Sequence, residues 1–136
     1  MFDKPNIIIV DDHLIFRHVI KSFISIENIA NVIGEASDGE VFVELLSHLK
    51  PDLVLMDIDM PNMNGFDATL KALELMPYLK IIVFTMFGSE DCYYKMIGLG
   101  VKGFLLKSNG INELEKAIKD VMMGKSYFPQ SLPVNN

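Results

Sequence analysis

Short apolar runs alternate with amphipathic stretches along almost the whole chain. Runs rich in Ile, Val, Leu and Phe occupy residues 7–10, 32–36, 53–56, 81–84 and 103–106. The first, third and fourth are nearly continuously apolar, as expected of strands covered on both faces of a sheet. Between the runs, helical patterns lie near residues 13–26, 41–49, 65–76, 89–99 and 111–122. Asn109 or Asn112 is available to cap the last of these helices.

The strict alternation of strands and helices determines the expected fold class. It predicts an α/β protein with a doubly wound, five-stranded parallel sheet and five helices on its two faces. A length of 136 residues suits one domain, which we expect to span residues 1–125. Residues 126–136 include Pro129 and Pro133 and are expected to form a C-terminal tail or a truncated linker.

Charged and polar residues directly follow four of the five apolar runs. Asp11 and Asp12 follow the first run, Asp57 the third, Thr85 the fourth and Lys107 the fifth. In open α/β sheets, functional groups gather beyond the carboxyl ends of the strands, where the strand order reverses. If the first and third strands are neighbours, three carboxylates therefore meet at one edge of the sheet.

This set of groups has the chemistry of phosphoryl transfer. Clustered carboxylates repel unless a proton or a cation relieves them, and their oxygens suit Mg²⁺. Lys107 and Thr85 offer a positive charge and a short donor for anionic oxygens. We therefore hypothesise that Asp57 becomes an aspartyl phosphate. Taken singly, Asp12 is also a candidate helix cap, Thr85 a capping hydroxyl and Lys107 a solvated lysine.

Composition narrows the class of protein further. The formal charge of −6 argues against direct binding to nucleic acid or to an anionic membrane, because both need a basic face. The single cysteine, Cys92, cannot form an internal disulfide, which favours a reducing compartment. The first residues lack a signal-peptide pattern, and no apolar run is long enough to span a bilayer. We therefore expect a cytoplasmic domain.

Four segments carry a resemblance to a known family: IIIVDDH, DLVLMDIDMPNMNG, IIVFT and KGFLLK. They contain the acid pair, an Asp-x-x-x-Pro-x-x-x-Gly loop (Asp57, Pro61, Gly65), the threonine and the lysine, in that order. In these features the chain resembles the receiver (CheY-like) domains of bacterial two-component response regulators. The resemblance covers residues 6–124 and implies a flavodoxin-like fold with strand order 2-1-3-4-5.

The resemblance also implies an acceptor and a metal site. Asp57 would accept a phosphoryl group from a histidine kinase or a phosphotransfer protein. Asp12 and Asp57 would bind Mg²⁺ directly, the backbone carbonyl of Asp59 would be a further ligand, and Asp11 would act through water.

The phosphoryl-contacting and switch residues are implied in the same way. Thr85 and Lys107 would contact the phosphoryl oxygens, and Phe104 would be the switch aromatic that couples to Thr85 and turns inward on phosphorylation. Many receivers have a Lys-Pro bond after the lysine that is often cis. Here Ser108 follows Lys107, and a cis bond is costly without proline, so the isomer of this bond stays open.

Details of the sequence look most similar to one subfamily. DDH followed by IFR, GEASDGE, LLKS and GKSYFP resemble the receivers of LuxR/NarL-type regulators, in which a helix-turn-helix domain follows. This implies the regulatory domain of a transcriptional regulator, with a homodimer on phosphorylation as one expected assembly. A free-standing receiver that signals by protein contact is the alternative.

Two other classes stay open beside the receiver. Asp57-Ile58-Asp59 resembles the nucleophile motif of haloacid-dehalogenase-type phosphatases, but that motif lies on the first strand, whereas here it closes the third. A pseudo-receiver that only binds partners is disfavoured by the complete set of acids, threonine and lysine.

Two further patterns are interpreted as structural. The glycine pattern in residues 98–103 follows a predicted helix instead of opening one, so it predicts a turn and not a nucleotide site. His13, His18 and His48 lack zinc-like spacing and are predicted to be surface groups.

Overall fold

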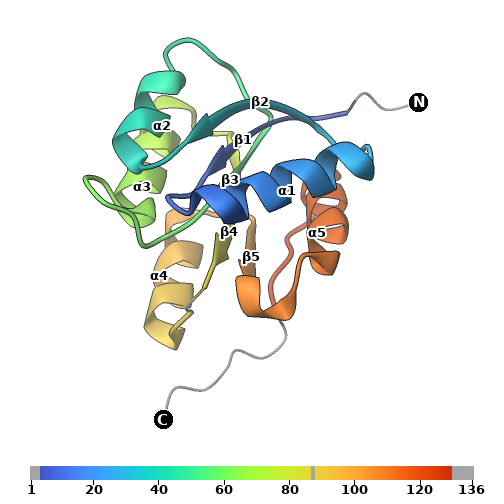
Figure 1. Ribbon diagram of the computed structural model, residues 1–136. Helices are drawn as coiled ribbons and strands as arrows, with labels where there is room; N and C mark the ends of the chain where they lie inside the picture. The colour runs from blue at the N-terminus through green and yellow to red at the C-terminus, as the bar shows by residue number, and fades with distance from the viewer. Residues whose placement is uncertain (1–3, 87, 130–136) are drawn as a thin grey trace.

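The computed structural model, in which residues 4–86 and 88–129 are described, contains a five-stranded sheet (Figure 1). The strands are β1 (Asn6–Val10), β2 (Asn31–Ala36), β3 (Leu53–Met56), β4 (Lys80–Thr85) and β5 (Gly103–Leu106). Neighbouring strands are parallel, and their order is β2-β1-β3-β4-β5. The predicted fold class and strand order are confirmed.

Five α-helices cover the two faces of the sheet (Figure 1). They are α1 (Leu14–Ile26), α2 (Gly39–Leu45), α3 (Gly65–Leu75), α4 (Glu90–Leu99) and α5 (Asn112–Met122). α1 and α5 contribute Ile20 and Ile118 to one core, and α2, α3 and α4 contribute Phe42, Ala72 and Met96 to the other. Because both faces are covered, the central strands are continuously apolar. No helix within the described ranges is long and apolar enough to cross a membrane.

The end of α2 and the cap of α5 differ from the predictions. α2 ends at Leu45, although the apolar spacing continues to Leu49, which still packs against the core. The Leu49 backbone N–H donates to the Leu45 carbonyl at 2.8 Å, so this stretch continues as hydrogen-bonded turns. The caps expected from Asn109 or Asn112 are wrong. Ile111 precedes the first turn of α5 and has no polar side-chain atom that could cap it. Asn112 is the first residue of the helix itself, and Asn109 belongs to the short 3-10 helix after β5.

Residues 126–129 return to the open edge of β5. The backbone N–H of Phe104 donates to the Tyr127 carbonyl at 3.0 Å, and the Tyr127 hydroxyl donates to Glu113 of α5 at 2.8 Å. The first part of the predicted tail is therefore held against the sheet. Residues 130–136 lie outside the described part of the chain.

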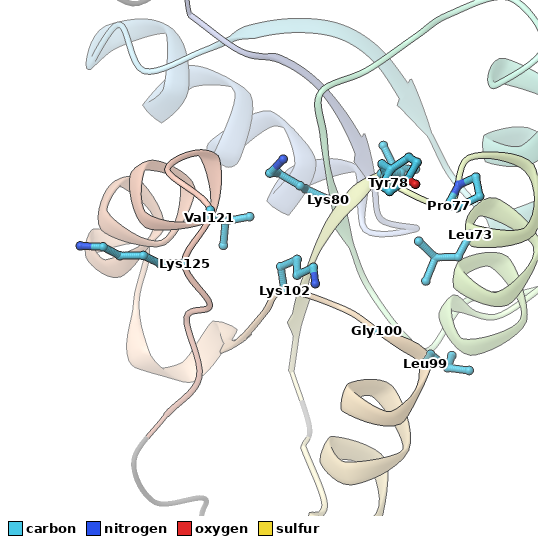
Figure 2. A pocket seen from close by; sticks show the side chains of 11 residues that line it. Leu73, Pro77, Tyr78, Lys80, Leu99, Gly100, Lys102, Val121 and Lys125 are labelled. Carbon is cyan, nitrogen blue, oxygen red and sulfur yellow. The ribbon is translucent and has the colours of Figure 1, made fainter.

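A hollow of about 420 Å³ lies at the amino-terminal ends of β4 and β5 (Figure 2). Lys80, Lys102 and Lys125 line it, together with apolar groups such as Leu73 and Leu99. None of the described residues around it is a carboxylate. The hollow is thus at the opposite end of the strands from the acids that the sequence singled out.

Candidate functional site

The carboxyl ends of the strands bring the predicted acids together. The backbone N–H of Asp57 donates to the Val10 carbonyl at 2.9 Å, and that of Asp11 donates to the last carbonyl of β2 at 3.0 Å. Both residues therefore extend the sheet directly. Carboxylate oxygens of Asp11, Asp12 and Asp57 and a ring nitrogen of His13 all lie within 4.8 Å of one another.

Lys107 is held between two of these acids. It begins the 3-10 helix Lys107–Asn109 that follows β5. Its Nζ lies 2.7 Å from Asp11 Oδ2 and 3.3 Å from Asp57 Oδ2, and only 2% of its side chain is exposed. The ammonium also lies 4.4 Å from the centre of the Phe16 ring. The predicted phosphoryl contact is thus a buried cation already paired with two carboxylates, and the bond that follows it is trans.

Burial raises the pKa of the Asp57 carboxyl above its ordinary value. The ammonium of Lys107 lowers this pKa, and the negative charge of Asp11 raises it again. The N–H of Ile58, 2.8 Å from Asp57 Oδ1, and the hydroxyl of Thr85 lower it to a smaller extent. Since the net shift is upward, the ionised carboxylate is costly in this site, and additional positive charge would stabilise it.

Replacing Asp57 with asparagine is expected to raise the melting temperature at neutral pH in metal-free buffer. A carboxyl whose pKa is raised by folding contributes stability below its ordinary pKa, and this contribution is lost as the pH rises through the raised value. The advantage of Asp57→Asn should therefore be greatest at neutral pH. It should shrink as the pH falls towards 3.8, the ordinary pKa of the group. Thermal unfolding across this pH range measures the difference.

Glu35 provides a control of opposite sign. Its carboxylate accepts a hydrogen bond from Lys21 at 2.9 Å, and this contact is the main reason that its pKa is lowered. Glu35→Gln should therefore lower the melting temperature at neutral pH, and the loss should fade as the pH falls through the lowered pKa. A neutral-pH melting temperature of Asp57→Asn below that of the parent would contradict this interpretation of the buried carboxylate.

Three further predicted site residues, Thr85, Phe104 and Asp59, lie outside the acid cluster. Thr85 is buried at the end of β4. Phe104 is fully buried on β5, and its ring centre lies 5.2 Å from that of Tyr93 in an edge-to-face contact. The side chain expected to turn inward thus already faces the core. Asp59 lies in the exposed loop after β3, where its carboxylate is near α4 and adds to the effect of burial in raising the pKa of Cys92.

The donor set fits a hard divalent cation. Three carboxylates converge, and the ammonium of Lys107 does not offset the burial that is the main cause of the raised pKa of Asp57. The cluster is buried at Asp11 and Asp57 but opens to solvent at Asp12, whose side chain is 29% exposed. Mg²⁺ prefers oxygen ligands and keeps several waters, so it needs an open side of this kind.

Two residues that lie near the acids could not be identified as site residues from the sequence. His13 is exposed, as predicted, yet its Nδ1 lies 3.4 Å from both Asp11 Oδ1 and Asp12 Oδ1. Arg17, one turn further along α1, donates to the backbone carbonyl of Asp11 and to Glu35. Only their positions in the sequence could have indicated this role. His13 directly follows the acid pair, and Arg17 lies one helical turn after His13.

Comparison with known proteins agrees with the geometry. The sequence model of the family described as the response regulator receiver domain matches residues 7–119. The transcriptional regulatory protein DegU of Brevibacillus brevis is 35% identical over 126 residues, which cover 93% of this chain and 53% of DegU. Response regulator GacA of Pseudomonas aeruginosa is 34% identical over 123 residues, which cover 90% of this chain and 58% of GacA. The chain spans little more than half the length of these relatives.

The isolated receiver domain of RcsB from Salmonella enterica serovar Typhimurium, solved with the phosphomimetic BeF₃⁻, has the same fold. It superimposes with a TM-score of 0.87 and 27% identity, and the match covers 94% of this chain and 95% of that one. The residues matched by the family run from β1 into α5 and include the acids, Thr85 and Lys107. This chain therefore belongs to the family of response regulator receiver domains.

Proposed function

We propose that Asp57 is the phosphoacceptor of a signalling switch. The observation that carries the proposal is a buried carboxylate, with a raised pKa, held beside two further acids and a buried ammonium at the strand ends. The donor would be a phosphohistidine of a histidine kinase or of a phosphotransfer protein. An oxygen of Asp57 forms the new bond to phosphorus, the phosphorus–nitrogen bond of the donor breaks, and the imidazole keeps that electron pair.

Mg²⁺ is the cofactor that we assign to the acid cluster. Asp12 and Asp57 would hold it through their carboxylates, Asp59 through its backbone carbonyl and Asp11 through water. When bound, the ion supplies positive charge that offsets both the carboxylates and the transferred phosphoryl group. This fits the raised pKa of Asp57, because burial, its main cause, makes the ionised carboxylate costly unless further positive charge is present.

Lys107 and Thr85 would then contact the phosphoryl oxygens. The Lys107 ammonium already lies 3.3 Å from Asp57 Oδ2, and its side chain has the rotatable bonds to turn towards a phosphoryl oxygen. Thr85 ends the neighbouring strand. Phe104 lies on β5, two residues before the strand partner of Thr85, and is buried against Tyr93. Through Thr85, Lys107 and Phe104, phosphorylation would change the surface formed by α4, β5 and α5.

The output that we propose is regulation of transcription by a longer protein. DegU is a transcriptional regulatory protein, and this chain covers about half of its length. The acidic charge of −6 disfavours direct nucleic-acid or membrane contact by this domain. We propose that it signals by protein contact, with a homodimer on phosphorylation as one assembly. We place the protein in the cytoplasm, in line with its lone cysteine. A free-standing receiver remains the alternative output.

Incubation with an acyl phosphate, with and without Mg²⁺, tests the proposal. Intact mass is measured for the parent, for Asp57→Asn and for Asp91→Asn, a control at an exposed aspartate in the first turn of α4. We expect one phosphoryl adduct in the parent and in Asp91→Asn, dependent on Mg²⁺ and absent from Asp57→Asn.

Other outcomes identify the competing classes. An adduct that persists in Asp57→Asn would show that a different residue is the acceptor. No adduct in the parent would favour a pseudo-receiver. We propose that the chain is not a turnover enzyme, because the carboxylate of Asp59, which would be the general acid of a phosphatase, is not part of the acid cluster. Sustained phosphate release from unrelated monoesters that requires Asp59 would instead indicate a phosphatase.

A further inference from the structure

His13 gives the acid cluster a donor that the proposed Mg²⁺ site does not need. Its imidazole directly follows the acid pair, and its nitrogen is one of four ligand atoms that lie within 4.8 Å of one another. The other three are carboxylate oxygens of Asp11, Asp12 and Asp57. Nitrogen is a poor ligand for Mg²⁺ but a good one for first-row transition metals.

The position of the ring is suited to coordination. Nδ1 lies 3.4 Å from Asp11 Oδ1 and 3.4 Å from Asp12 Oδ1. Adjacent ligands of an octahedral ion with bonds of about 2.1 Å are about 3 Å apart, so little movement is needed. The backbone N–H of His13 donates to Asp11 Oδ1 at 2.8 Å and keeps this carboxylate beside the ring.

The imidazole has no evident role in holding the fold. His13 precedes the first turn of α1, yet its side chain makes no capping hydrogen bond. The side chain is 62% exposed, on the open side of the cluster. Its polar neighbours in the described structure are the two acids, of which Asp12 is a proposed direct ligand of the metal and Asp11 acts through water.

We propose that His13 is a nitrogen ligand of this metal centre and that it shifts the preference of the centre from Mg²⁺ towards transition-metal ions such as Mn²⁺ and Co²⁺. The inference rests on the proposed function, because it assumes that the acid cluster binds a divalent cation. Three oxygen donors and one nitrogen form a softer set than oxygens alone, and affinity for such sets rises along the first-row series.

Metal affinities of single variants test the proposal. Isothermal titration calorimetry with Mg²⁺ and with Co²⁺ is performed on the parent, on His13→Ala and on His18→Ala. The last variant is the control, because it removes an exposed histidine of α1. We expect His13→Ala to weaken Co²⁺ binding by about ten-fold or more, the loss typical when a supporting group is removed from a metal site. Mg²⁺ binding should change by less than about two-fold, because Mg²⁺ gains little from nitrogen. His18→Ala should match the parent for both ions.

Pulsed electron paramagnetic resonance of the Mn²⁺-loaded protein reports the ligand directly. We expect nitrogen hyperfine modulation in the parent and in His18→Ala, and its loss in His13→Ala. If His13 acted only as a positive charge beside the acids, His13→Ala would instead strengthen the binding of both ions, and that result overturns the proposal.

The failure of this inference is distinguishable from the failure of the proposed function. If the parent binds Mg²⁺ and Asp57→Asn weakens that binding, the metal centre stands. An unchanged ratio of Co²⁺ to Mg²⁺ affinity in His13→Ala, without nitrogen modulation in the parent, then rejects the role of His13 alone. If the parent binds neither ion, the metal centre itself is rejected, and the role of His13 with it.

Discussion

Replacing Gly65 with alanine is expected to destabilise the protein by about 3 kcal/mol or more, at the upper end of the cost of overpacking a core. Gly65 is buried at the start of α3, and its N–H donates to the Ile58 carbonyl at 2.8 Å. A Cβ atom at this position would collide with the backbone carbonyl oxygen of Asp57 and lie 2.8 Å from the Cα of Ile58. Both obstacles are backbone atoms, so no side-chain rotation relieves the clash.

The same substitution should also slow phosphoryl uptake in the protein that does fold. Relief of the clash requires the backbone at Asp57 to move away from α3. That backbone is tied to β1 by the hydrogen bond from the Asp57 N–H to the Val10 carbonyl, so the shift misplaces the carboxylate relative to Lys107. Urea unfolding gives the loss of stability, and adduct formation with an acyl phosphate gives the rate.

Gly98→Ala is the matched control. Gly98 lies within α4, and a Cβ atom there would meet nothing within 4 Å. Alanine in a helix interior is more favourable than glycine by about 0.5–1 kcal/mol, so this variant should gain stability and keep normal phosphorylation. A free energy of unfolding for Gly65→Ala equal to that of the parent would contradict the close packing of α3 on the backbone of Asp57.

The pattern of apolar residues predicted the sheet closely because both of its faces are buried. β3 and β5 have the predicted bounds, and the other three strands begin one residue earlier, at Asn6, Asn31 and Lys80. These polar residues join the hydrogen-bonded ladder without an apolar side chain, so periodicity cannot detect them. At Leu49 the pattern predicts too long an element, because this residue is apolar and half-buried but lies beyond the end of α2.

The site was predictable in its composition and less so in its contacts. Position after an apolar run placed Asp11, Asp57 and Lys107 at one edge, since parallel strands end together. The pairing of Lys107 with Asp57 joins residues 50 positions apart in the sequence, and depends on the path of the loops, which no local pattern describes. For the same reason His13 looked like an ordinary surface group, although its ring faces the acids.

Replacing Lys107 with methionine is expected to destabilise the protein by about 3–5 kcal/mol at neutral pH, the usual cost of removing one partner of a buried ion pair. Methionine keeps much of the length of the lysine stem but lacks its charge. Asp11 and Asp57 would then be buried next to each other without their shared cation, which lies 2.7 Å and 3.3 Å from them. The cost should shrink as the pH falls and the carboxyl of Asp57, whose pKa is raised, takes up a proton. Chemical unfolding at several pH values measures it.

Two further variants separate the loss of a buried charge from a general loss of a lysine. Lys119→Met removes an exposed partner of Glu115, 2.9 Å away and one turn earlier on α5, and should cost only about 0.3–0.5 kcal/mol. Asp57→Asn combined with Lys107→Met removes one of the two acids as well, so Asp57→Asn should gain more stability in the Lys107→Met background than it gains in the parent. If Asp57→Asn gained no more stability in the Lys107→Met background than in the parent, the two side chains would not interact, and the buried ammonium would have no part in holding the Asp57 carboxylate.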